Sequence, residues 1–100
     1  MDVQVQSIRF VADQKLISFV KQKLSKLNLF FDQIVDAEVF LKIDKANNNE
    51  NKIVEIKLNI PGKDLFAKKI GKSFEEATDD SIEAIRRQLK RHKGKLFTKG

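Results

Sequence analysis

The chain of 100 residues contains no cysteine and only one histidine. The absence of cysteine excludes disulfides, thiol redox chemistry and cysteine-ligated zinc. The one histidine, His92, lies among lysines and arginines, which repel metal cations, and a single imidazole does not form a metal site. We therefore expect neither a metal nor a cofactor.

Long apolar segments are also missing. No run of apolar residues approaches the roughly 18 that a membrane-spanning helix requires. The first ten residues, MDVQVQSIRF, carry an early acid and alternate in polarity, so they indicate a β-strand rather than a signal peptide. These features predict a cytoplasmic protein that has no membrane partner.

The groups that catalysis requires are scarce as well. The sequence has no set of nucleophile, base and orienting group, no glycine-rich loop for phosphates and no second histidine. Asp79, Asp80 and Glu83 cluster near the start of a predicted helix, where acids interact favourably with the helix dipole. We predict that the protein is not an enzyme and has no small-molecule substrate.

What the chain does contain suits one soluble domain, with 41% hydrophobic and 34% charged residues. Alternating apolar residues predict strands over 2–10, 35–43 and 53–60, and a weaker strand over 63–71. Apolar residues at helical spacing predict helices over 14–29 and from residue 74 to about residue 93.

The order β-α-β-β-β-α predicts an α+β fold, in which a four-stranded sheet has both helices packed on one face. This arrangement is related to the double-stranded RNA-binding domain. We expect a single domain over residues 1–96 and a flexible tail over 97–100.

Capping residues set the expected helix boundaries. Asp13 is the expected N-cap of the first helix, and Ser73-Phe74-Glu75-Glu76 matches a capping box with Ser73 as the cap. Gly94 is expected to end the last helix. The residues predicted to face the core are Val35, Ala37, Val39, Leu41 and Ile43 in the second strand, and Ile82, Ile85 and Leu89, continued by Leu96, in the last helix.

The net charge of +6 is concentrated at one end of the chain. Residues 1–85 hold 13 basic and 14 acidic side chains, whereas residues 86–100 hold seven basic side chains and no acid. Bases near a helix C-terminus complement the helix dipole, but seven without an interspersed acid repel one another and exceed that requirement. The pattern favours a surface that binds nucleic acid or another polyanion.

Two known modes of RNA binding fit this sequence poorly. Double-stranded RNA-binding domains contact phosphates near the start of their last helix, and here that start, FEEATDDS, would repel phosphate. Exposed aromatic residues on a sheet bind single-stranded RNA, but the aromatic strand motif of an RRM is absent. We expect most of the eight phenylalanines to lie in or over the core, with Phe40 as a candidate for exposure.

The residue patterns resemble those of a known family, the ribosome hibernation promoting factors, also called the ribosome-associated inhibitor or sigma-54 modulation protein family. The segment KLSKLNLFFDQIVDAEVFLKI is similar to that family's passage from the first helix to the second strand. DLFAKKIGKSFEEATDDSIEAIRRQLKRHKGK is similar to its fourth strand and final helix, and RQLKRHKGK is the most specific piece. The resemblance covers nearly the whole chain.

Two positions depart from the family pattern. Family members often carry a tyrosine early in the last helix and a lysine one turn before the Arg-Gln-Leu, where this chain has Glu75 and Ala84. One expected basic contact is therefore missing. Long family members continue into a dimerisation domain, and because this sequence resembles the short form, we expect a monomer.

The resemblance implies binding to the small ribosomal subunit and its rRNA, in the channel of the mRNA and of the A- and P-site tRNAs. The protein would block translation under stress without any turnover. His92 matches a Lys-His-Lys stretch of the family, and whether it contacts RNA or packs is open. The residues expected to form the RNA-binding surface are Lys23, Lys26, Arg86, Arg87, Lys90, Arg91, His92, Lys93 and Lys95.

Two other functions are compatible with the same residues. The basic helix could dock on an acidic protein partner, or the chain could be a free RNA-binding domain. An RNA contact predicts that co-purification with ribosomal subunits is sensitive to nuclease, whereas a contact with a protein would survive nuclease. The sequence leaves open whether ribosomes end as dimers or as inactive single particles.

Overall fold

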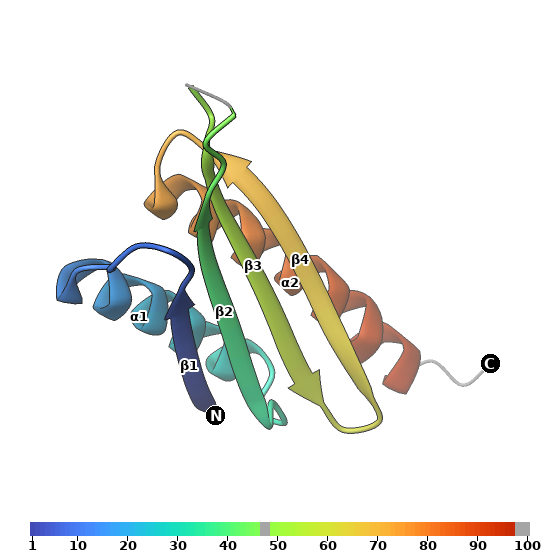
Figure 1. Cartoon of the computed structure of the whole chain (residues 1–100). Helices are drawn as coiled ribbons and strands as arrows, with labels where there is room; N and C mark the ends of the chain where they lie inside the picture. The colour runs from blue at the N-terminus through green and yellow to red at the C-terminus, as the bar shows by residue number, and fades with distance from the viewer. Residues whose placement is uncertain (47–48, 98–100) are drawn as a thin grey trace.

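The computed structural model describes residues 1–46 and 49–97, with the backbone alone for residues 95–97. Its elements, in chain order, are β1 (Asp2–Ser7), α1 (Gln14–Phe30), β2 (Asp36–Ile43), β3 (Lys52–Ile60), β4 (Lys63–Gly71) and α2 (Phe74–Phe97). The sheet has the order β1-β2-β3-β4, with β1 parallel to β2 and the other neighbours antiparallel. Both helices lie on one face of the sheet (Figure 1), so the predicted α+β fold is confirmed.

Both predicted helix caps are present. Asp13 Oδ1 accepts a hydrogen bond from the backbone N–H of Leu16 at 2.8 Å. Ser73 Oγ accepts one from the N–H of Glu76 at 3.0 Å. Each cap satisfies a backbone donor that has no partner inside its helix, and this explains why α1 and α2 begin where they do.

The core lies between the sheet and the two helices. Side chains alternate along each strand, so every second residue of the sheet points toward the helices. Ile56 at the centre of β3 pairs with Val39 of β2 and Ala67 of β4, and all three are buried. From the helices, α1 contributes Val20, Leu24 and Leu27, and α2 contributes Phe74, Ala77, Ile85 and Leu89.

The first strand is shorter than predicted. β1 ends at Ser7 rather than at residue 10, because Arg9 has a φ of 64° and turns the chain out of the extended conformation. Phe10 then leaves the sheet and stacks on Phe74, with ring centroids 5.1 Å apart. This contact ties the β1–α1 connection to the start of α2.

Val35 was predicted to face the core, and this is wrong. Its side chain is 58% exposed, because the residue precedes β2 and does not share the pleat of the strand. Its backbone N–H still donates to Asn59 O at 2.9 Å. Four other residues of this strand were also predicted to face the core. Ala37, Val39 and Leu41 are buried, whereas Ile43, at the end of the strand, is 37% exposed.

The predicted end of the last helix is also wrong. α2 continues through Gly94 to Phe97, and Gly94 has ordinary helical geometry rather than the positive φ of a C-terminal cap. Glycine permits a left-handed residue at a helix end but does not impose one. The side chains of residues 95–97, including Leu96, and all of residues 98–100 lie outside the described part of the chain.

The phenylalanines divide between the core and the surface. Phe31 and Phe74 are buried, and Phe10, Phe19 and Phe30 pack partly against the core. Phe40 is half-buried on the face of the sheet opposite the helices, whereas Phe66 on the same face is 52% exposed. Over the described residues, neither helix combines the length and apolar character that a membrane span requires.

Candidate nucleic-acid interface

The two helices lie side by side and run in the same direction. Lys23 Nζ of α1 lies 3.4 Å from Asp79 Oδ1 of α2. Seven residues further along α1, the ring of Phe30 lies 5.1 Å from the guanidinium carbon of Arg86. Because the contacts advance together along both helices, the C-terminal ends of α1 and α2 lie next to each other.

This parallel arrangement gathers positive charge over half of the helix layer. α1 contains four lysines and no acid, and two of them, Lys23 and Lys26, lie in its second half. The acids of α2 lie before residue 84, starting with Glu75 and Glu76 in its first turn. The negative dipole ends of both helices therefore lie among cations, which stabilises each helix and attracts external anions.

Five of the predicted RNA-binding residues form an exposed set, which we call the cationic surface. Of these, Arg87 has an acidic neighbour, with its Nε 3.9 Å from Glu83 Oε1. Both side chains are more than half exposed, so this pair contributes little stability. Within the described residues the other four have no ion pair. The cationic surface consists of Lys26, Arg86, Arg87, Lys90 and Arg91.

Lys23 lies apart from this set because the structure gives it an internal partner. Its side chain is 34% exposed and forms the ion pair with Asp79 described above. Its ammonium also lies 5.4 Å from the centroid of the Phe19 ring. Lys23 therefore links α1 to the N-terminal half of α2.

Lys93 has an internal partner too. Its Nζ donates to the carbonyl of Phe30 at 3.2 Å and lies 4.5 Å from the centroid of the Phe30 ring. The carbonyl belongs to the last residue of α1, where the helix leaves acceptors unsatisfied. Lys93 therefore caps α1 from the neighbouring helix.

His92 is half-buried and packs against a core phenylalanine. Its ring meets Phe31 edge to face, with centroids 5.7 Å apart, and Phe31 is buried. The structure shows this packing, and because His92 is only half-buried, its contact with RNA stays a prediction. The side chain of Lys95, another predicted contact, lies outside the described residues.

Sequence reasoning missed several residues that shape this region. Phe30 bears the cations Arg86 and Lys93 on its ring, and Asp79 binds Lys23, yet each was assigned only a packing or dipole role. On the other side of α2, Lys63 shares a cavity of about 180 Å³ with Arg91. Arg86 and Lys93 are seven residues apart and therefore lie on the same face of α2. This spacing indicates that one aromatic ring of a neighbouring helix can contact both, but the sequence does not show that α1 is that neighbour.

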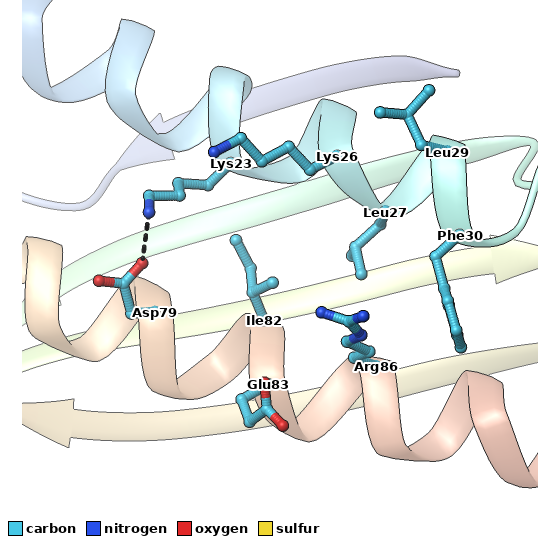
Figure 2. A pocket seen from close by; sticks show the side chains of 9 residues that line it. All are labelled: Lys23, Lys26, Leu27, Leu29, Phe30, Asp79, Ile82, Glu83 and Arg86. Atoms are coloured by element: carbon cyan, nitrogen blue, oxygen red, sulfur yellow. Dashed lines mark ion pairs between the residues drawn. The ribbon is translucent and has the colours of Figure 1, made fainter.

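A groove runs between the two helices beside the cationic surface (Figure 2). Its volume is about 500 Å³, within the range of ligand pockets. The two helices contribute both apolar and charged side chains to it. The lining residues are Lys23, Lys26, Leu27, Leu29, Phe30, Asp79, Ile82, Glu83 and Arg86.

The capping role of Lys93 predicts a measurable loss of stability. Replacing Lys93 with methionine keeps the aliphatic stem but removes the bond to the Phe30 carbonyl and the contact with its ring. We expect a loss of about 1 kcal/mol of unfolding free energy, measured by urea denaturation. The control Lys90→Met removes an equal charge from an exposed site and should change stability by less than about 0.5 kcal/mol. Equal effects of the two variants would contradict the assigned role.

The fold and the charge distribution define a small α+β domain whose helix layer is cationic at one end. The chain belongs to the family described as Sigma 54 modulation protein / S30EA ribosomal protein, whose pattern matches residues 3–96. This result confirms the family resemblance of the sequence.

Curated relatives carry ribosome hibernation names. The chain is 36% identical over 78 residues to the ribosome hibernation promoting factor of Klebsiella oxytoca, covering 78% of each protein. It is 30% identical to the factor of Pseudomonas putida, over 95% of this chain and 89% of the relative. The match to the Deinococcus radiodurans ribosome hibernation promotion factor is 37% identical over 75% of this chain, and spans 40% of that longer protein.

Two solved structures share the fold. A ribosomal subunit interface protein from Coxiella burnetii superposes with a TM-score of 0.84 and 20% identity, over 94% of this chain and 99% of that one. The N-terminal domain of Thermus thermophilus Protein Y gives a TM-score of 0.80 at 19% identity, over 92% of this chain and 99% of that one. At these identities the likeness establishes the fold alone.

Proposed function

We propose that this chain is a ribosome hibernation factor that binds the small ribosomal subunit in the channel of the mRNA and of the A- and P-site tRNAs. Its cations contact rRNA phosphates, and its body occupies the space that the translation substrates need. Membership of the family and the names of the relatives support this proposal.

The observation that carries the proposal is the exposed, acid-free half of the helix layer. Lys90 and Arg91 have no ion-pair partner in the described part of the chain, and Arg87 has only a weak one. Free cations on a rigid helix bind phosphates without first breaking an internal pair. The acidic N-terminal half of α2 would repel phosphate, so the protein has one preferred orientation on RNA.

The proposed action is steric and requires no covalent step. A domain held by α2 in the channel excludes mRNA and tRNA for as long as it stays bound. Each phosphate that is neutralised releases counterions, so binding weakens as salt increases. With five exposed cations engaged, the log–log slope of affinity against salt should be about −3 to −5.

Co-sedimentation of the intact chain with ribosomes and with separated subunits, across a salt series, tests this function. We expect pelleting with small subunits and whole ribosomes, loss of binding as salt increases with the slope given above, and release after nuclease treatment. A protein that stays in the supernatant at low salt would overturn the proposal. Pelleting that survives nuclease would assign the surface to an acidic protein partner instead.

A further inference from the structure

The groove between α1 and α2 combines apolar walls with charges of both signs. Ile82 of α2 and Leu27 of α1 form apolar walls, and Phe30 lies toward one end (Figure 2). A groove that bound phosphate alone would need no apolar walls. These walls suit the flat, weakly polar faces of a nucleic-acid base.

Arg86 supplies the positive charge near the Phe30 end of the groove, whereas the side chain of Lys26 extends toward Lys23 (Figure 2). Arg86 is exposed and has no acidic partner among the described residues. The guanidinium of Arg86 lies over the Phe30 ring, at 5.1 Å from its centroid, and this contact holds its planar group in place. A phosphate binds favourably at this end, and the guanidinium plane offers a surface on which a base can stack.

A carboxylate occupies the opposite end. Lys23 lies 3.4 Å from Oδ1 of Asp79, and Oδ2 has no partner among the described residues. The Asp79 side chain is 53% exposed, so a ligand can reach it. Asp79 and Arg86 are seven residues apart on α2, which corresponds to about 10 Å along the helix axis. This separation matches the scale of one nucleotide from its phosphate to the far edge of its base.

We infer that the groove takes one unpaired guanine nucleotide of RNA. Its phosphate lies against the guanidinium of Arg86, and the edge of the base donates to the carboxylate of Asp79. Guanine presents two neighbouring N–H groups, which suit a carboxylate acceptor. Uracil presents one N–H between two carbonyls, which a carboxylate repels. The inference rests on the proposed function, because it names a nucleotide that the RNA-binding surface selects.

The test is a comparison of two short RNAs that differ at one base. The intact chain is titrated at low salt with 5′-labelled r(UUGUU) and r(UUUUU), and binding is followed by fluorescence anisotropy and by backbone amide NMR shifts. We expect about fivefold or greater preference for r(UUGUU), with its additional amide shifts confined to the groove segments of α1 and α2. Equal affinities, no binding of either RNA, or shifts outside the groove would overturn the inference.

The variant Asp79→Asn tests whether the preference for guanine depends on the hydrogen bonds that the Asp79 carboxylate accepts or only on its negative charge. It removes a negative charge, so r(UUUUU) should bind equally well or better, while the preference for guanine is lost. The matched control Asp80→Asn removes the same charge from the next residue, which does not line the groove, and should keep the preference. Loss of the preference in both variants, or in neither, would contradict the role of Asp79.

Ribosome co-sedimentation of the same preparations distinguishes a failure of the guanine-binding groove from a failure of the proposed function. Binding to ribosomes without any guanine preference would overturn the groove assignment and leave the proposed function in place. Absence of binding to ribosomes as well as to both RNAs would overturn both.

Discussion

The double variant Arg87→Glu/Lys90→Glu is expected to lose about 100-fold or more in affinity for ribosomes. Each reversal replaces an attraction to phosphate with a repulsion, and two unit charges 4 Å apart in water interact by about 1 kcal/mol. Two reversals therefore change the binding free energy by up to about 4 kcal/mol. The salt slope should also decrease by about 2, because two phosphate contacts are lost. Co-sedimentation across a salt series measures both quantities.

The variant Lys45→Glu/Lys72→Glu is the matched control. It makes the same change in net charge, but Lys45 lies in the connection between β2 and β3, and Lys72 lies two residues before the start of α2. That connection and the start of α2 lie at the end of the molecule opposite the C-terminal end of α2 (Figure 1). We expect its affinity to stay within about threefold of the unaltered chain, because distant exposed charges are screened by salt. If both double variants weaken binding equally, net charge rather than the α2 surface determines binding.

Both charge variants should remain folded. Arg87 and Lys90 are exposed, and the only ion pair lost in the described residues is the weak one between Arg87 and Glu83. The new glutamate at position 87 lies one turn from Glu83, which costs a few tenths of a kcal/mol. A circular dichroism melt that is nearly unchanged would show that any loss of binding comes from the surface.

Truncation of Leu89 is expected to give the largest loss of stability. Leu89 is fully buried, at 0% exposure, where α2 packs on the sheet at the level of the cationic surface. Leu89→Ala removes buried apolar volume and leaves a cavity, and such changes cost about 2–5 kcal/mol. A domain of this size has about 5–15 kcal/mol of stability, so the variant should unfold at a clearly lower urea concentration.

Leu29→Ala is the control for this substitution. Leu29 lies on α1 and is 88% exposed, so the same change of side chain removes almost no buried surface. We expect its unfolding free energy to change by less than about 0.5 kcal/mol. Similar losses for Leu29→Ala and Leu89→Ala would mean that the assigned packing of α2 is wrong.

Much of the fold could be predicted because it depends on local patterns. Ala37, Val39 and Leu41 alternate in the sequence and are buried in β2, and Asp13 and Ser73 cap their helices as predicted. The failures occurred where a local signal permits more than one outcome. Glycine occurs at helix ends and also in helix interiors, and Gly94 lies inside α2. Arg9 adopts a positive φ that ends β1, and an arginine in the sequence does not predict a positive φ.

The candidate site was predictable as a region but not in detail. The sequence by itself determined that the cations gather at the end of the last helix, because their order along the chain is the order along α2. Only the tertiary structure decided which of the described cations have no internal partner. The parallel packing of α1 on α2 brings Phe30 to Lys93 and Asp79 to Lys23, and it opens the groove between the helices. These contacts join residues more than 50 positions apart, so they depend on packing in three dimensions, which no local pattern encodes.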